Sequence, residues 1–442
     1  MMRNAHLLTT FLVILLLTVV SPAIDEKDLL GDYPLAPGVT LTLSPHSSIG
    51  MVSAKITGRE PFLFVERECC HYDIPEIGGE ARFGQMKKGG HVSLRLDAYD
   101  QTVTAWKAPE GTDASGAVKI PKDPTERLKV WVPVWMIQHN VPGVSIALIR
   151  NRRIVRTMQF GLKKAGRPGR VDEDSVFEAC SMSKPLFAYA VLKLVEQKKL
   201  NLDRPLDSYL PEPYLPDEPE AGRITTRMVL NHTTGLPNWR KGGRHAKMLT
   251  LRHKPGERFI YSGEGMWYLQ RVVEQITGKP INEYMTETLM SRIGMDRSSY
   301  VWQERYPENY AHGHNKAGKP NNYRYYTDGN TAFSLYTTPA DYARYLILMM
   351  DTTPEEDFQI SAGTLNRMLT PESRRSEGVY YGLGWAIGGP DGARYVYHGG
   401  SNGSGFRCHA RFYRRDGSGI VVMTNATTGA TLYNKVLDQV YP

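Results

Sequence analysis

Two patterns of apolar and polar positions divide the chain. From residue 24 to about residue 121, apolar residues recur at every second position, as in residues 39–43 and 91–96. This alternation is typical of strands that bury one face, and Gly and Pro interrupt the runs at short intervals. The pattern predicts a small β-rich domain over residues 24–121, with a sandwich as one form of it. Packing against the rest of the chain is its simplest role.

The pattern changes over residues 122–442. Residues 125–139 carry helical periodicity, two strands are predicted at residues 143–149 and 154–160, and residues 225–350 are mainly helical. Strands return in residues 382–425. Strands at both ends with helices between them predict an α+β fold, in which one sheet is assembled from both ends and an all-helical insertion interrupts it. A stretch rich in Gly, Ala, Pro and Asp, residues 108–124, is predicted to be the linker between the two domains.

Composition adds little to this picture. The chain has 442 residues, of which 41% are hydrophobic and 23% charged, as in ordinary globular proteins. Its formal net charge of +8 is spread along the chain apart from residues 150–156 and 241–247. Because no basic stripe accompanies an aromatic platform, we expect no nucleic-acid partner.

The N-terminus carries a short apolar run. Arg3 precedes residues 7–20, and small residues at Ser21 and Ala23 occupy the positions that a signal peptidase reads. The run is shorter than the ~20 residues of a membrane-spanning helix. Residues 1–23 are therefore predicted to be a cleaved signal peptide, which implies a secreted or periplasmic protein with no membrane span after cleavage.

Four cysteines and one His-x-His pair are candidates for disulfide bridges and for a metal site, respectively. Bridges between Cys180 and Cys408 or between Cys69 and Cys70 would suit an oxidising compartment, whereas Cys180 is also typical of a small buried residue. The pair His312 and His314 lies in a polar stretch and is predicted to be solvated rather than metal-binding. The sequence predicts no metal and no cofactor.

One stretch suggests covalent chemistry. Ser181-Met182-Ser183-Lys184 comes directly before an apolar run, residues 186–194, that is predicted to be a helix. Residues three apart share a helix face, so the Lys184 amine is expected beside the Ser181 hydroxyl. Lysine can take the serine's proton only if burial or a neighbouring cation lowers its pKa from ~10.4. Taken alone, the pattern fits a capped helix start equally well.

Two further segments bear on Ser181. Tyr261 is predicted on a loop before the helix of residues 266–276, and a tyrosine acts as a base only when adjacent cations lower its pKa, a charge that Lys184 could supply. His398 is followed by Gly399 and Gly400, before a strand-like segment. Histidine can donate or relay a proton, and glycines allow close approach of the backbone. Singly, Tyr261 and His398 are also typical of packed core residues.

Three motifs, in this order and spacing, resemble the serine β-lactamase-like superfamily, whose relevant branch holds class C-type β-lactamases, DD-peptidases and related esterases. They are Ser181-Met182-Ser183-Lys184, Tyr261-Ser262-Gly263 and His398-Gly399-Gly400. Connecting segments fit too, among them residues 224–237 and 381–385. The resemblance covers roughly residues 124–441 and excludes the N-terminal region. It implies a β-lactamase/transpeptidase-like fold, with an antiparallel sheet flanked by helices and the all-helical insertion.

The resemblance also implies roles for individual residues. Ser181 would be the acylated nucleophile, with Lys184 and Tyr261 as its base system. The backbone N–H groups of Ser181 and Ser401 would form the oxyanion hole. His398 would stand where lactamases carry the lysine of their Lys-Thr-Gly motif.

Two departures from the family pattern bear on the substrate. Gly263 replaces the asparagine of Tyr-x-Asn, and His398-Gly399-Gly400 replaces Lys-Thr-Gly. The amide is thereby lost at Gly263, the permanent cation at His398 and the hydroxyl at Gly399, and each lost charge-assisted bond costs a few kcal/mol. Gly263, Gly399 and Gly400 are the predicted substrate-binding positions. Efficient β-lactamase activity is not expected. Glu264 flanks this motif and is expected either in the pocket or on the surface.

The sequence therefore predicts a secreted, cofactor-free serine hydrolase that cleaves an ester or amide bond in a small molecule or peptide. One alternative is a D-amino-acid-directed cell-wall peptidase. Another is a non-catalytic binding protein on the same fold, with the N-terminal β-rich domain as its functional part. The intact Ser181, Lys184 and Tyr261 argue against the second alternative.

Overall fold

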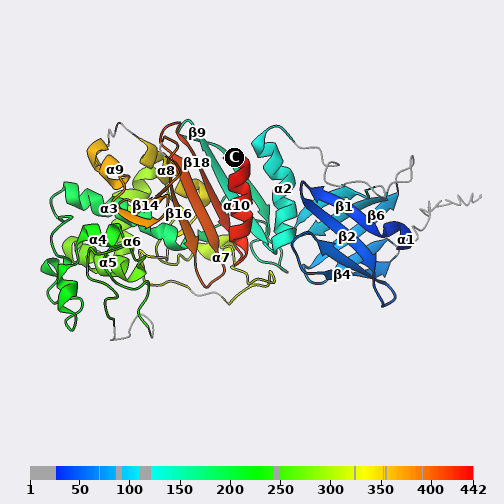
Figure 1. The fold of residues 1–442 in the computed structure, drawn as a ribbon, viewed down its shortest axis with the longest axis horizontal. Coiled ribbons are helices and arrows are strands. Elements are labelled where there is room, and N and C mark those ends of the chain that lie inside the picture. The colour runs from blue at the N-terminus through cyan, green and yellow to red at the C-terminus, as the bar shows by residue number, and fades with distance from the viewer. Residues whose placement is uncertain are drawn as a thin grey trace, which may run out of the picture.

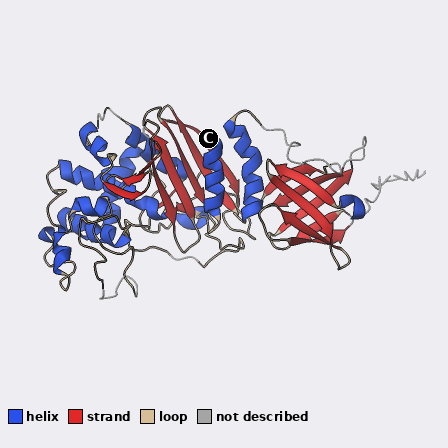
Figure 2. Ribbon diagram, viewed as in Figure 1, coloured by secondary structure: helices blue, strands red, loops and turns tan. Residues whose placement is uncertain are grey.

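The computed structural model has three regions along its length. Strands with one short helix form one end, a sheet between helices forms the middle, and helices dominate the other end (Figure 2). The predicted signal peptide, Cys69 and most of the predicted linker lie outside the described residues. The structure describes residues 26–68, 70–85, 92–108, 121–241, 249–322, 325–351, 353, 356–390 and 392–441.

The N-terminal region is one antiparallel meander in which every strand pairs with the next along the chain. A short helix, α1 (Glu26–Leu29), precedes it. Its strands are β1 (Gly31–Ala36), β2 (Val39–Pro45), β3 (Met51–Ile56), β4 (Phe62–Glu68), β5 (His71–Ile74), β6 (Gly79–Gln85), β7 (Val92–Ala98) and β8 (Gln101–Trp106).

This meander curls into a barrel (Figure 1). The N–H of Ala108, just after β8, donates to the carbonyl of Asp32 in β1 at 2.7 Å, so the last strand returns to the first. Along β2, Val39, Leu41 and Leu43 are buried while the residues between them are more exposed, as the alternation predicted. The predicted β-rich domain is confirmed, but the sandwich is wrong. Short turns join neighbouring strands in sequence order, and a continuous meander closes on itself instead of splitting into two sheets.

The second sheet is also antiparallel, with the strand order β10-β9-β18-β17-β16-β15-β14-β13. Two short strands, β11 and β12, pair separately. The strands are β9 (Gly143–Arg150), β10 (Arg153–Gly161), β11 (Phe177–Glu178), β12 (Tyr336–Thr337), β13 (Ser373–Ser376), β14 (Val379–Tyr381), β15 (Ala386–Gly388), β16 (Tyr395–Ser401), β17 (Arg407–Tyr413) and β18 (Ser418–Thr424).

Helices cover both faces of this sheet and fill the insertion. In Figure 1, α2 and α10 lie between the sheet and the barrel, and the other helices lie beyond the sheet. They are α2 (Pro124–His139), α3 (Ser183–Glu196), α4 (Thr226–Leu230), α5 (Gly263–Thr277), α6 (Ile281–Met285), α7 (Tyr306–Asn309), α8 (Pro339–Met350), α9 (Ala362–Met368) and α10 (Gly429–Val440). Single helical turns are η2 (Cys180–Met182), η3 (Leu206–Tyr209), η4 (Pro219–Arg223), η5 (Thr286–Met290) and η6 (Ser291–Ile293).

The sheet joins the two ends of the second region. Strand β9, near its start, pairs with β18, near its end, from Val144 opposite Thr424 to Ile149 opposite Gly419. This pairing confirms the predicted sheet assembled from both ends with a helical insertion. Both strands are almost wholly buried, which explains their continuous apolar sequences.

The barrel packs on the C-terminal end of α2. Buried residues of the barrel, α2, α10 and the neighbouring sheet face form one continuous hydrophobic cluster. Two polar contacts orient the junction: Arg59 donates to the carbonyl of Ile137 at 2.8 Å, and Gln138 donates to the carbonyl of Thr57 at 2.6 Å. Within the described residues, no helix is both long and apolar enough to cross a bilayer.

Candidate active site

Ser181 lies on a tight turn at the start of α3. Cys180, just before it, has a left-handed backbone (φ 52°), a conformation that a non-glycine residue adopts only when its surroundings hold it there. The Ser183 hydroxyl donates to the carbonyl of Cys180 at 2.6 Å and closes the turn. Residues on both sides are buried, whereas Ser181 is half-buried. The turn therefore presents one hydroxyl to solvent from a rigid interior.

Lys184 lies one turn further along the same face. Its Nζ is 3.2 Å from the Ser181 Oγ and 2.6 Å from the carbonyl oxygen of Ala332. The side chain is fully buried. Burial disfavours the charged amine and lowers the pKa of Lys184 from 10.5 to about 7. A neutral amine is thus available beside the hydroxyl near neutral pH, as the Ser-x-x-Lys spacing predicted.

Tyr261 completes this cluster. A side-chain hydrogen bond joins it to Ser181, and Lys184 Nζ lies 4.9 Å from the centre of its ring. Burial raises the pKa of Tyr261 above its usual range, and the bond from Ser181 opposes this only in part. The expectation that the Lys184 charge lowers this pKa is wrong, because burial dominates and also removes much of that charge. Tyr261 is a protonated donor at neutral pH.

His398, in β16, is buried near Tyr261, with 6.2 Å between the ring centres. Its Nδ1 lies 2.8 Å from the carbonyl oxygen of Gly399, which can only accept, so this nitrogen carries the proton. The Nε2 atom has no hydrogen-bond partner among the described residues and is an acceptor. Burial and the nearby Lys184 charge lower the pKa of His398 to about 3. A neutral acceptor thus stands where lactamases carry a cation.

The glycines of β16 differ from each other. A Cβ added at Gly400 would overlap the carbonyl oxygen of Ala179, so only glycine lets this strand approach the Ser181 turn. At Gly399 the nearest atom to such a Cβ is 3.8 Å away, which is an ordinary contact. Ser401 ends the strand, pairs with Arg407 of β17, and lines the same hollow as Ser181. The backbone of Ser401 is thereby brought beside the nucleophile turn.

Sequence reasoning missed His232. Its ring centre lies 4.4 Å from that of Tyr261 and 5.1 Å from that of Tyr381. Its Nδ1 accepts from the N–H of Ser262 at 3.2 Å. Burial lowers the pKa of His232 well below its usual value, so the ring is neutral. The loop of residues 231–237 resembled the family, but nothing local indicated that its histidine supports the tyrosine ring.

A buried carboxylate was also missed. Glu178 accepts hydrogen bonds from Tyr310 at 2.6 Å, Ser404 at 2.7 Å, Tyr326 at 3.1 Å and Asn402. Burial raises the pKa of Glu178, whereas these donors favour its charged form. Tyr326 and Asn402 both line the hollow in front of Ser181. Glu178 therefore holds two walls of the hollow together.

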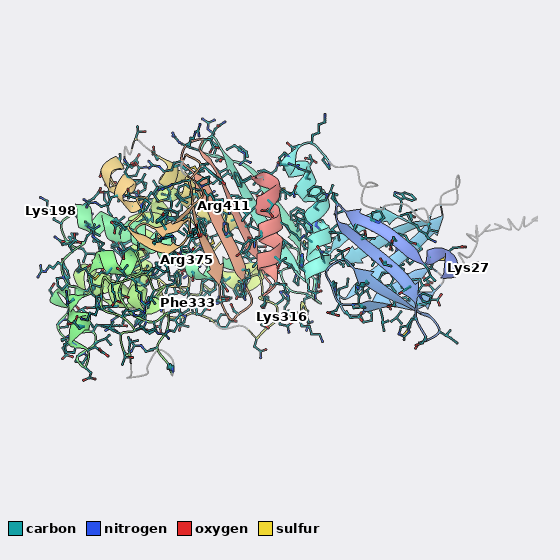
Figure 3. All side chains as sticks on the ribbon, in the orientation of Figure 1. Lys27, Lys198, Lys316, Phe333, Arg375 and Arg411 are labelled. Carbon is teal, nitrogen blue, oxygen red and sulfur yellow. The ribbon has the colours of Figure 1, made fainter. Side chains whose placement is uncertain are left out.

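The hollow has a volume of about 410 Å³. Glu264 is buried in its wall, where its carboxylate pairs with Arg240 and accepts from Tyr214 at 2.6 Å. The two expectations for Glu264 are thus resolved in favour of the pocket. The lining residues are Ser181, Asn238, Trp239, Arg240, Glu264, Trp267, Tyr326, Asn330, Phe333, Ser401, Asn402 and Gly403. Figure 3 shows Phe333 among the helices, far from the barrel that carries Lys27.

The other polar candidates have structural partners. His314 is buried: its Nδ1 lies 2.7 Å from the carbonyl of Asn425, and its Nε2 accepts from the N–H of Ala165 at 3.0 Å. The prediction that it is solvated is wrong, because it ties a loop to the end of β18. Across the described residues, no group of three or more His, Cys, Asp or Glu side chains could hold a metal ion.

Two of the cysteines flank the nucleophile turn. Cys180 and Cys408 are free thiols, and both donate to the carbonyl of Glu178, at 3.4 and 3.3 Å. Burial raises the pKa of both thiols. Both pack as small buried residues. Of the two possibilities for Cys180, a bridge to Cys408 or a small buried residue, the structure has the second.

The fold and the arrangement of Ser181, Lys184 and Tyr261 define a class, the serine β-lactamase-like hydrolase fold. The model of the Beta-lactamase family matches residues 115–439, and the chain belongs to that family. Protein flp of Staphylococcus aureus (strain NCTC 8325 / PS 47) is 24% identical over an alignment of 281 residues that covers 58% of this chain and 52% of flp.

Two other similar proteins are named for different activities, one as an esterase and one as a D-alanine carboxypeptidase. Esterase EstB of Burkholderia gladioli is 30% identical over 203 residues, 39% of this chain and 50% of EstB. D-alanine carboxypeptidase AmpC of Burkholderia cenocepacia superimposes with a TM-score of 0.61 at 20% identity, covering 72% of this chain and 99% of that chain. The chain spans about half the length of the curated relatives flp and EstB.

Proposed function

We propose that the chain is a secreted serine hydrolase that cleaves an ester or amide bond through an acyl-enzyme on Ser181. The observation that carries this proposal is the 3.2 Å contact between Ser181 Oγ and the buried Lys184 amine, whose pKa is about 7. A packing lysine has no reason to be buried as a neutral base beside a half-exposed hydroxyl. The apolar run of residues 7–20 supports secretion.

Each proton has a place in this reaction. The neutral Lys184 amine takes the proton of Ser181 as Oγ attacks the carbonyl carbon, and the backbone N–H groups of Ser181 and Ser401 stabilise the oxyanion. When the tetrahedral intermediate collapses, Tyr261 gives its proton to the leaving group and recovers one from Lys184. Water then attacks the acyl carbon, and its proton passes to the same amine. As the bond between the acyl carbon and Ser181 Oγ breaks, Lys184 returns that proton to Oγ and the acid product leaves. His398 Nε2, an acceptor without a protein partner among the described residues, is open to a donor of the substrate.

The site favours an esterase or peptidase over an efficient β-lactamase. His398 is neutral, so it supplies no charge for a β-lactam carboxylate, and Gly263 supplies no amide. The esterase name of EstB supports the ester substrate. A D-amino-acid-directed peptidase uses the same machinery and is an outcome of the experiment below.

The experiment is hydrolysis of a panel by the wild type and by Ser181→Ala, with intact-mass detection of acylation. The panel holds a short-chain nitrophenyl ester, a chromogenic cephalosporin and a D-Ala-D-Ala peptide. Ester or peptide turnover that vanishes in Ser181→Ala is expected, and the preferred compound chooses between esterase and peptidase. Fast cephalosporin turnover would contradict the role given to Gly263 and His398. Absence of acylation by every compound would favour a non-catalytic binding protein.

A further inference from the structure

The space beside Gly263 is already occupied. A Cβ built on Gly263 would lie 2.5 Å from Cη2 and 2.7 Å from Cζ2 of the Trp239 indole, closer than real Cβ atoms approach. Gly263 has an ordinary backbone, with no positive φ that would demand glycine. The Trp239 ring therefore takes the room that a longer side chain at position 263 would use, and such a side chain would have to displace the ring.

The indole is held in this position from two sides. Asn238 clamps its loop to the start of α5, since its side-chain oxygen accepts from the N–H of Gly263 at 2.8 Å and its carbonyl accepts from the N–H of Glu264 at 2.9 Å. The Trp239 ring meets Phe333 edge-on, with 5.4 Å between centres and 82° between planes. Trp239 is nevertheless 44% exposed and lines the hollow, so part of its surface is open to a substrate.

Other parts of the hollow are also lined by aromatic side chains. Trp267, Tyr326 and Phe333 join Trp239 in its lining. Its charged lining residues, Glu264 and Arg240, pair with each other, so among the described lining residues no charge is left for a charged group. Such aromatic walls favour flat apolar groups, with about 0.5–1.5 kcal/mol per aromatic pair beyond burial.

The hollow receives the acyl part of the substrate. In the proposed reaction Tyr261 and Lys184 protonate the leaving group, and neither lines the hollow. Ser181 and Ser401, which hold the carbonyl carbon and oxygen, lie at its edge. The leaving group therefore departs towards Tyr261, while the acyl group extends towards Trp239.

We infer that Trp239 is a specificity-determining residue, which selects uncharged acyl groups with a flat aromatic or apolar body and disfavours acylamino groups. An acylamino group needs a polar partner, and here it meets an indole face where the family's asparagine would stand. This inference rests on the proposed function, because it names the substrate class of the same site.

The test varies the acyl group and keeps the leaving group constant. The probes are p-nitrophenyl acetate, butyrate, phenylacetate, N-acetylglycinate and hemisuccinate. For the wild type, kcat/KM is expected to be highest for phenylacetate, about tenfold or more above N-acetylglycinate and hemisuccinate. Trp239→Ala is expected to lower the ratio of phenylacetate to acetate by about tenfold, whereas Trp239→Phe keeps most of it.

A matched control separates this effect from the loss of any exposed tryptophan. Trp106, at the end of β8 in the barrel, is 45% exposed, almost the same as Trp239. Trp106→Ala is expected to leave the phenylacetate-to-acetate ratio unchanged. Equal ratios in the wild type and Trp239→Ala, or a ratio that Trp106→Ala lowers equally, would overturn the inference.

A pair of variants tests the steric argument itself. Gly263→Asn alone is expected to lose activity on all esters, because its side chain collides with the indole. Trp239→Ala combined with Gly263→Asn frees that space and is expected to favour N-acetylglycinate over phenylacetate. A double variant that still prefers phenylacetate would overturn the inference. If the wild type hydrolyses none of the five esters and is acylated by none, the proposed function itself fails.

Discussion

The Nζ atom of Lys184 is closer to the carbonyl oxygen of Ala332, at 2.6 Å, than to the Oγ of Ser181, at 3.2 Å. The carbonyl can only accept, so it engages one N–H of the amine. In the neutral amine this contact leaves the lone pair free to accept the hydrogen of Ser181. The carbonyl of Ala332, in the helical insertion, thereby orients the Lys184 amine towards the Ser181 hydroxyl.

This geometry predicts how activity depends on pH. The reaction needs the deprotonated amine, and burial lowers the pKa of Lys184 to about 7. The kcat/KM for an ester is therefore expected to rise tenfold per pH unit below about 7 and to level off above it. A pH–rate profile with p-nitrophenyl acetate measures this. Lys184→Arg, whose side chain stays charged, is expected to lose at least about 10³-fold at every pH.

A histidine substitution serves as the control for that assignment. The pKa of His398 is about 3, so this residue has finished titrating before the profile begins to rise. His398→Gln is expected to lower the plateau and to leave the midpoint near 7. A midpoint that disappears in His398→Gln would assign the ionisation to the histidine and contradict the role of Lys184.

The same buried amine predicts a cost in stability. Lys184 has a pKa of about 7 when folded and ~10.4 when unfolded, so the unfolded chain binds more protons between these values and stability rises with pH there. Below pH 7 the folded state bears the full cost, roughly 5 kcal/mol. Lys184→Met is expected to raise the free energy of unfolding by a few kcal/mol at pH 6.5 and by much less at pH 10. Chemical denaturation at both pH values measures it, and a pH-independent difference would contradict it.

Gly400 predicts a second structural effect. A methyl group at this position collides with the carbonyl oxygen of Ala179, next to the nucleophile turn. Gly400→Ala is expected to push β16 away from Ser181, to lower kcat by about 10²-fold or more, and to destabilise the fold by about 1–3 kcal/mol. Gly399→Ala is the matched comparison, since its nearest neighbour is 3.8 Å away, and its melting temperature is expected to stay close to that of the wild type. Equal losses in both variants would show that contact with Ala179 is not the cause.

Local patterns predicted much of this arrangement. The three-residue spacing of Ser181 and Lys184 placed them on one helix face, and the 3.2 Å contact confirms it. Alternation along residues 39–43 and the two strands predicted at residues 143–149 and 154–160 likewise match β2, β9 and β10. The Ser181–Lys184 contact joins residues three positions apart, which local helix geometry determines. The buried positions of a strand repeat every second residue, so the sequence itself records them.

Other features depend on contacts between distant segments, which no local pattern records. The closure of the barrel needs Ala108 to reach Asp32, and nothing in either strand indicates that pairing. The pKa of Tyr261 was predicted in the wrong direction, because burial depends on the whole fold whereas the neighbouring lysine was visible in the motif. Trp239 was overlooked for the same reason: its contact with Gly263 joins a loop to the start of α5, 24 positions further along the chain.

Glu178 carries the last prediction, because its carboxylate joins segments that only the fold brings together. Tyr310, Tyr326, Asn402 and Ser404 all donate to it. Glu178→Gln replaces one acceptor oxygen by an NH₂ group that faces these donors, so at least one buried bond is lost and a donor is left unpaired, at a cost of about 1–3 kcal/mol. The variant is also expected to lower kcat more than it raises KM, because Asn402 directly follows Ser401.

Thermal unfolding and kinetics on one ester measure both effects, with Glu173→Gln, a change at an exposed carboxylate in the loop before β11, as the control. A Glu178→Gln variant as stable and as active as Glu173→Gln would show that the carboxylate does not position this wall.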